Sequence, residues 1–265
     1  MTDIKFPKID MTKWNYNPKD KVFYQLSILY SSKHPSPDHN TFAIFIPEVY
    51  FSSSKNQDNK TYTCALNKDS KCGKFSSSSA PFAFLVETPG YFDCKSLKEY
   101  RSFTEYTNKG IIYIYPGCRG RDHGAPLGIV DLKAVVRYIK YNKDILPGDT
   151  SKIITFGMSG GGAQSALMGS SGDSSLFEPY LKEIGAVEES DEVYGSMCWC
   201  PVTNLDQGNE SYEWNLGISR KNLDEESKNI SDKMSEIFAK YINDIEIKGE
   251  KGEILKLEKS ENGIY

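Results

Sequence analysis

Ser159 is the residue whose type and surroundings best fit a catalytic nucleophile. It occupies the pentapeptide Gly157-Met158-Ser159-Gly160-Gly161, after the apolar run Lys152 to Phe156 and before small residues that open a helix. A Gly-x-Ser-x-Gly sequence between a strand and a helix is typical of a nucleophile elbow, where glycines let strand and helix close around a strained serine. The predicted chemistry is attack of the Ser159 hydroxyl on a carbonyl carbon.

The same glycines admit two other interpretations. One is a structural glycine-rich turn. The other is an anion site, because Gly160-Gly161-Gly162 opens a helix whose N-terminus favours negative charge. The segment lacks the Gly-Lys-Ser/Thr ending of a phosphate loop and the glycine spacing of a dinucleotide fingerprint, which argues against the anion site.

An oxyanion hole would need two backbone amides beside this serine. The amide after the nucleophile supplies one, which here is Gly160, and a loop after an earlier strand supplies the other. The segment Glu87 to Tyr91 follows the predicted strand Pro81 to Val86, so Gly90 and Tyr91 are the candidates. An ordinary turn at the strand exit is the alternative.

The general base is the missing component. A serine of this kind is followed along the chain first by Asp or Glu and then by His, yet the only histidines are His34, His39 and His123. His123 lies past the predicted strand Ile111 to Tyr115, on the sheet edge expected to carry the elbow, and is therefore the possible base. A surface histidine is the alternative, and His34 and His39, in a proline-rich turn, need no role.

The elements around Ser159 predict an α/β fold. Two aromatic and β-branched segments, Lys21 to Tyr30 and Asn40 to Phe51, flank the turn signal Pro35-Ser36-Pro37 and predict antiparallel strands, while Ser52 to Ser79 is predicted as a polar surface excursion. From residue 80, short apolar runs alternate with helical patterns, which a parallel sheet with helices on both faces requires. These runs are Pro81 to Val86, Ile111 to Tyr115, Lys152 to Phe156 and Val193 to Cys200.

Several helices are predicted from apolar spacing. Ile129, Leu132, Val136 and Ile139 indicate a crossover helix that ends before Pro147-Gly148 and leads into the strand before Ser159. Helices are also expected over 160–169 and 175–184. Beyond Pro201 the chain becomes polar, and an amphipathic helix over 230–245 precedes a hairpin about Lys251-Gly252.

Composition sets the remaining limits. With 265 residues, of which 38% are hydrophobic, the chain can bury one sizeable core. A net charge of −4 gives no basic field for nucleic acid, and Met1 to Asp20 contain neither a signal peptide nor a membrane span, so a cytoplasmic location is expected. The six cysteines are expected as free thiols. Cys64 and Cys72 could instead face each other across a hairpin, whereas Cys198 and Cys200 are expected to be buried on one strand face.

Four segments carry collinear motifs, and they are residues 117–122 (GCRGRD), 125–138 (APLGIVDLKAVVRY), 157–172 (GMSGGGAQSALMGSSG) and 200–206 (CPVTNLD). Together, in a match over about residues 80 to 217, they strongly resemble bacterial tannases and the tannase/feruloyl-esterase-like α/β-hydrolases around them. The resemblance implies an α/β-hydrolase that cleaves aromatic carboxylic esters, such as galloyl or feruloyl esters, with Ser159 as nucleophile and no metal or cofactor. It implies a lid inserted after the sixth core strand, so that 1–217 is an incomplete core and 218–265 begins the lid.

The resemblance also implies that the acid, the histidine and the groups holding the phenolic acyl part come from the lid and later strands. A truncated product, half of a split enzyme or a degenerate paralogue would all look like this chain. The expected partner is a small-molecule ester, with a complementing C-terminal chain or self-association as further possibilities. A non-catalytic binding module and a self-sufficient enzyme that uses His123 remain open.

Overall fold

The computed structural model describes residues 6–33 and 38–260, and the chain divides into two compact units, Met1–Pro201 and Val202–Tyr265. The division falls earlier than the expected boundary at residue 217. The segment before that boundary forms helix α5, Gly208–Leu216, which packs on helix α6, Glu225–Asp244, with the Trp214 and Phe238 ring centroids 5.3 Å apart. His34 and the Pro35-Ser36-Pro37 turn lie outside the described residues.

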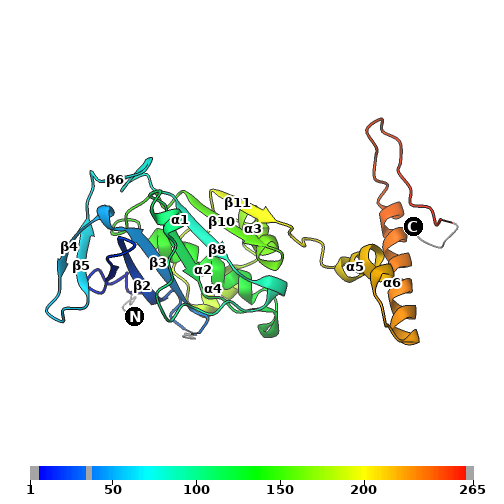
Figure 1. The fold of residues 1–265 in the computed structure, drawn as a ribbon, viewed down its shortest axis with the longest axis horizontal. Helices are drawn as coiled ribbons and strands as arrows, with labels where there is room; N and C mark the ends of the chain where they lie inside the picture. The colour runs from blue at the N-terminus through cyan, green and yellow to red at the C-terminus, as the bar shows by residue number, and fades with distance from the viewer. Residues whose placement is uncertain (1–5, 34–37, 261–265) are drawn as a thin grey trace. The chain divides into compact units, whose positions relative to one another are not determined.

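The first unit is built on a seven-stranded mixed sheet in the order β1-β2-β3-β9-β8-β10-β11 (Figure 1). The strands β1, β2, β3 and β9 pair antiparallel, whereas β9, β8, β10 and β11 pair parallel. The strand bounds are β1 Asn15–Asn17, β2 Val22–Leu29, β3 Thr41–Pro47, β8 Phe82–Val86, β9 Ile112–Pro116, β10 Ile153–Met158 and β11 Gly195–Trp199. The α/β fold and the six strands expected in this sheet are confirmed, and β1 is an addition.

The helices of the first unit lie on both faces of the sheet. On β3, Phe42 and Phe45 point to opposite faces, because side chains alternate along a strand. Phe45 meets Phe103, next to α1 (Thr104–Thr107), with ring centroids 4.9 Å apart, whereas Phe42 meets Tyr138 of α2 at 6.0 Å. Every residue of β3 and β9 is buried, as continuous apolar strands covered on both sides must be.

The remaining helices follow the predicted pattern. Helix α2 spans Leu127–Tyr141, α3 spans Gly160–Ser170 and α4 spans Glu178–Ile184. Helix α2 packs on α3 and α4, and α3 packs on β10 and β11 (Figure 1). The crossover from β9 through α2 to β10 therefore leads directly into Ser159.

The segment Ser52 to Ser79 is more ordered than a polar excursion. Strand β4, Phe51–Lys55, pairs with β5, Tyr62–Leu66, and β6, Lys71–Cys72, pairs with β7, Phe75–Ser76. Phe51 anchors the first hairpin, because its ring lies 4.9 Å from that of fully buried Trp14. These strands were not predicted from the sequence, because the segment is rich in serine and only one face of the first hairpin is apolar.

The cysteines depart from two expectations. Cys64 lies opposite Ser53 and Cys72 lies opposite Phe75, so the two thiols occupy different hairpins and do not face each other. All six cysteines are free, as expected. Cys198 is only half-buried and Cys200 is exposed, because β11 is the last strand of the sheet and ends at Trp199, before Cys200.

The second unit consists of α5, a 3-10 turn over Gly217–Ser219 (η4), α6 and a closing hairpin. The Asp224 side chain caps α6 by accepting a hydrogen bond from the Ser227 amide at 2.7 Å. Lys248 and Ile254 form an antiparallel bridge, which confirms the hairpin about Lys251-Gly252. Within residues 6–33 and 38–260, no helix combines the length and apolar character needed to cross a membrane.

Candidate active site

Ser159 stands at the turn between β10 and α3 with φ 57° and ψ −120°, a conformation that is strained for any residue other than glycine. Its amide donates to the carbonyl oxygen of Trp199 at 2.9 Å, so β11 holds the turn from one side. A Cβ added at Gly161 would lie 2.1 Å from the carbonyl oxygen of Val86. Only glycine lets α3 approach β8 this closely, which is the backbone geometry predicted for an elbow.

The Ser159 side chain is available for chemistry. The residue is partly exposed, and the neighbouring Met158 is 66% exposed. Within the described residues, Ser159 Oγ has no hydrogen-bond partner. The hydroxyl is therefore neither buried by packing nor already paired.

The loop after β8 lies against the start of α3. This loop is the 3-10 turn η2, Pro89–Tyr91, in which Gly90 and Tyr91 have φ near 60°. A Cβ added at Gly160 would lie 2.6 Å from the Tyr91 nitrogen and 3.2 Å from the Gly90 nitrogen. The structure thus brings Gly160, Gly90 and Tyr91 together. The Tyr91 amide already donates to Thr88 O at 3.0 Å, so Gly90 is the candidate for the second amide.

A buried hydrogen bond fixes this loop to the nucleophile helix. Thr88 is 1% exposed, and its Oγ1 donates to Oε1 of Gln164 at 2.8 Å. Gln164 lies one helical turn after Gly160. The spacing between η2 and the elbow is therefore set by side chains as well as by backbone contact.

His123 is placed beside another histidine. It lies in the exposed 3-10 turn η3, Arg121–His123, and its ring centroid is 5.1 Å from that of His39. His39 Nε2 is 3.0 Å from Oδ2 of Asp93, and this hydrogen bond holds the pKa of Asp93 below its ordinary value. In the described parts of the chain no hydrogen bond joins His123 to Ser159. The structure groups His123 with His39 and Asp93.

Sequence reasoning missed the position of His39, to which it gave no role. The antiparallel register places Phe42 opposite Pro116, so the start of β3 lies at the carboxyl end of β9. His39 precedes β3 and His123 follows β9, and the two consequently meet. Recognising the β3–β9 pairing in advance would have indicated this contact.

Buried polar groups hold the histidine loops in place. Arg119 donates from Nε and Nη2 to the two carboxylate oxygens of Asp131, at 2.9 and 2.7 Å. The Tyr30 hydroxyl donates toward the carbonyl oxygens of His39 at 2.8 Å and Gly117 at 3.0 Å. Both loops are therefore anchored to the core.

A mixed sheet with this strand order, a crossover into a strained serine and a loop after β8 packed against the helix that follows this serine define an α/β-hydrolase. The BD-FAE family model matches residues 77–245, and the chain belongs to this esterase family. It is a tannase- and feruloyl-esterase-like member of the α/β-hydrolases, as the four sequence segments indicated. A search of curated protein sequences finds no match.

The similar solved structures are tannases. A tannase from Fusobacterium nucleatum superposes with a TM-score of 0.73 at 31% identity, over 97% of this chain and 60% of that chain. Native tannin acyl hydrolase from Lactobacillus plantarum gives 0.72 at 26% identity, over 89% and 54%. A tannin acyl hydrolase in complex with ethyl gallate gives the same TM-score, identity and shares. This chain thus spans about three-fifths or less of the length of these tannases.

Proposed function

We propose that this chain carries the nucleophile and oxyanion site of a serine esterase that acts on aromatic carboxylic esters. The observation that carries the proposal is the strained, partly exposed Ser159, with the backbone of Thr88 to Tyr91 packed against Gly160. The esters are inferred from the similar tannin acyl hydrolase that holds ethyl gallate. A galloyl or feruloyl ester is the expected substrate class.

In the proposed reaction, Ser159 Oγ attacks the ester carbonyl carbon and loses its proton to a base. The oxygen of the tetrahedral intermediate takes the negative charge and accepts hydrogen bonds from the Gly160 and Gly90 amides. The C–O bond to the alcohol breaks, the alcohol leaves with a proton, and the acyl group remains on Ser159. Water then releases the aromatic acid and restores the hydroxyl.

The base has two possible sources under this proposal. One is a complementing chain, and the features that support it are the position of β11 at the end of the sheet and the exposed Met197 and Trp199 on that strand. Unpaired strand edges and exposed apolar side chains favour association. The second source is His123, which is favoured by its contact with the Asp93–His39 pair.

Mass spectrometry of the acyl-enzyme tests the nucleophile. After incubation with ethyl gallate, together with the complementing chain if that chain supplies the base, a galloyl adduct is expected on the peptide that contains Ser159, and Ser159→Ala should abolish it. Ser170→Ala, at the exposed end of α3, is the matched control and should keep the adduct. Equal adduct formation in Ser159→Ala would contradict the proposal.

Turnover distinguishes the sources of the base. If a complementing chain supplies it, the single chain should turn over slowly and gain activity with that chain. Loss of a serine nucleophile or its histidine costs on the order of 10⁶ in kcat, so the difference is measurable. His123→Ala should abolish turnover if His123 is the base, and an unchanged rate removes that assignment. Saturable ester binding without any adduct would instead support a non-catalytic binding module.

A further inference from the structure

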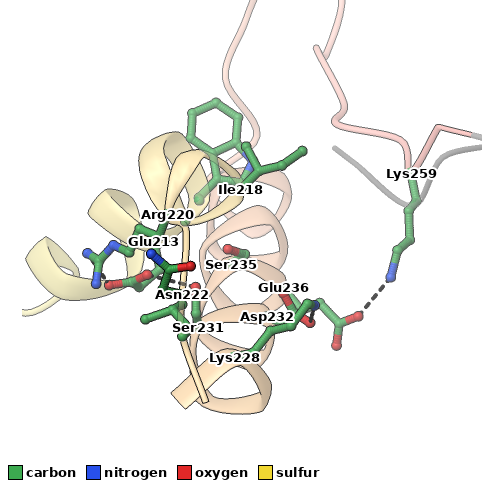
Figure 2. Close-up of a pocket in the computed structure, with 13 residues that line it drawn as sticks. Glu213, Ile218, Arg220, Asn222, Lys228, Ser231, Asp232, Ser235, Glu236 and Lys259 are labelled. Atoms are coloured by element: carbon green, nitrogen blue, oxygen red, sulfur yellow. Dashed lines mark hydrogen bonds and ion pairs between the residues drawn. The ribbon is translucent and has the colours of Figure 1, made fainter. Parts of the chain in front are cut away.

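The second unit contains a cavity of about 570 Å³ that the esterase proposal does not use. Its lining residues come from α5, η4, the segment leading to α6, α6 itself and Lys259 near the described end of the chain (Figure 2). Among the described residues, those that line it all belong to the second unit. A space of this size accommodates a small organic molecule.

The charged side chains of the cavity neutralise one another. Three cations and three carboxylates form three ion pairs, which are Arg220–Glu213 at 2.6 Å, Lys228–Asp232 at 2.6 Å and Lys259–Glu236 at 2.8 Å. An anionic or cationic ligand would meet like and opposite charges in equal number. The cavity therefore favours a neutral ligand over a phosphate or a carboxylate.

Glu213 is held in a fixed position on the cavity wall. Oε1 accepts from Arg220, and Oε2 accepts from the buried hydroxyl of Ser231 at 2.7 Å (Figure 2). A Cβ added at Gly217 would lie 2.6 Å from Ser231 Oγ, so glycine allows η4 to approach α6 here. Each carboxylate oxygen keeps a lone pair, and the guanidinium has five N–H donors. Acceptors and donors thus stand side by side, which suits two adjacent hydroxyl groups.

Trp214 adds a partly exposed aromatic ring to the same cavity. Its indole Nε1 is buried and has no hydrogen-bond partner among the described residues, and its ring packs on Phe238. Because that nitrogen is out of reach of solvent, the cavity offers a ligand the carbon surface of the ring, on which the C–H groups of a sugar ring can pack. Ser235 lines the cavity as well and supplies a further hydroxyl.

We propose that this cavity binds a neutral polyol of the sugar class through adjacent hydroxyl groups. The Glu213–Arg220 pair binds two neighbouring hydroxyls, and the Trp214 ring packs against the carbon atoms of the ligand. The inference concerns the second unit alone and does not rest on the proposed esterase function.

The test is a ligand-observed NMR titration of the full chain with methyl β-D-glucopyranoside. Cyclohexanol, which has a six-membered ring but one hydroxyl, and inorganic phosphate are the comparison probes. The glucoside should bind saturably, more tightly than either comparison probe, and with little dependence on salt. Trp214→Leu keeps an apolar side chain and removes the aromatic ring, so affinity should fall about fivefold. Glu213→Gln should lower it by a similar factor or more.

Lys240→Ala is the matched control, because Lys240 lies on α6 and pairs with Asp244 outside the cavity. It should leave affinity unchanged. Circular dichroism establishes that each variant keeps its helices, and Ser235→Ala serves as a milder variant with a smaller expected loss. Absence of saturable glucoside binding, tighter binding of phosphate or cyclohexanol, or equal affinity in Trp214→Leu and the unchanged chain would each overturn the proposal.

Discussion

At the level of single residues, the candidate site depends on glycines, which have no side chain. Ser159 holds a positive φ, which costs on the order of 1–3 kcal/mol and persists only where the surroundings enforce it. Those surroundings are backbone atoms, because Gly161 lies against Val86 and Gly160 lies against Thr88. The elbow is thus specified by glycines as much as by the serine.

Gly161→Ala should destabilise the elbow strongly. The added methyl group would lie 2.1 Å from a backbone oxygen, and such overpacking costs about 1–3 kcal/mol or more. Urea denaturation measures the free energy of unfolding. Gly195→Ala on β11 is the control, since nothing lies within 4 Å of its added methyl group, and it should change stability by no more than about 0.5 kcal/mol. Equal effects of the two substitutions would refute the packing explanation.

The cysteines should differ widely in reactivity. Burial raises the pKa of Cys94 to about 11 and that of Cys118 well above its ordinary value, whereas Cys200 is exposed. A two-unit rise lowers the reactive thiolate about 100-fold, in addition to the loss of access. Brief treatment of the native chain with iodoacetamide should label Cys200 first and leave Cys94 and Cys118 unlabelled until denaturant is added. Peptide mass spectrometry reads the order, and early labelling of Cys118 would contradict the burial described above.

At the level of elements, the strands and helices with a periodic apolar pattern could be predicted from the sequence, whereas elements and contacts that depend on pairing with another segment could not. The apolar runs gave β8, β9, β10 and β11, and the spacing of Ile129 to Ile139 gave α2, because burial imposes those patterns directly. The glycines around Ser159 predicted the turn between β10 and α3. The β4–β5 hairpin and α5 were not predicted, because their sequences are polar and the residues on which they pack, Trp14 and those of α6, lie elsewhere in the chain. For the same reason the contact between His39 and His123 could not be predicted, since it depends on the β3–β9 register.

A buried ion cluster joins α2 to α4 and to the segment before β11. Lys133 Nζ is 2.7 Å from Asp191 Oδ1, Arg137 Nη2 is 2.8 Å from Asp191 Oδ2, and Arg137 also pairs with Glu178. Burial opposes ionisation of Asp191, but hydrogen bonds from Lys133 and the Asp173 amide, with the nearby cations, lower its pKa overall. Its contribution to stability is therefore present above the unfolded pKa of about 3.9 and is lost as pH falls through the lower folded value.

Asp191→Asn should accordingly destabilise the first unit in a pH-dependent way. At neutral pH the substitution leaves Lys133, which is fully buried, without its carboxylate, and such losses cost about 3–5 kcal/mol. Urea denaturation at neutral pH and below the folded pKa of Asp191 measures the difference. The gap between the two proteins should shrink in acid, because Asp191 is then protonated. Lys143→Ala, which removes an exposed partner of Glu189, should have little effect at either pH. A gap that stays constant with pH would exclude this role for the Asp191 charge.

At the level of the whole molecule, the two units differ in what stabilises them. The main apolar cluster, within the described residues, is formed by side chains from Phe6 to Val193 and includes none from the second unit. The second unit relies on α5 against α6, on ion pairs and on a small aromatic contact between Trp214, Phe238 and Tyr241. The segment 201–205 that joins the units has no regular structure and is mostly exposed. The proposed esterase site therefore belongs to a unit with its own apolar core.

Cutting the joining segment should leave the first unit folded. A recognition sequence for a site-specific protease, inserted between Thr203 and Asn204, would lie in exposed chain outside both cores. After cleavage the fragment from Met1 to Thr203 should unfold at nearly the same temperature as the uncut protein, because no contact of the main cluster is lost. The same sequence inserted between Gly161 and Gly162 is the control, since there it interrupts the elbow and should abolish cooperative unfolding. A large fall in the melting temperature of the fragment would mean that the second unit stabilises the sheet, and Ser159 would then depend on both units for its geometry.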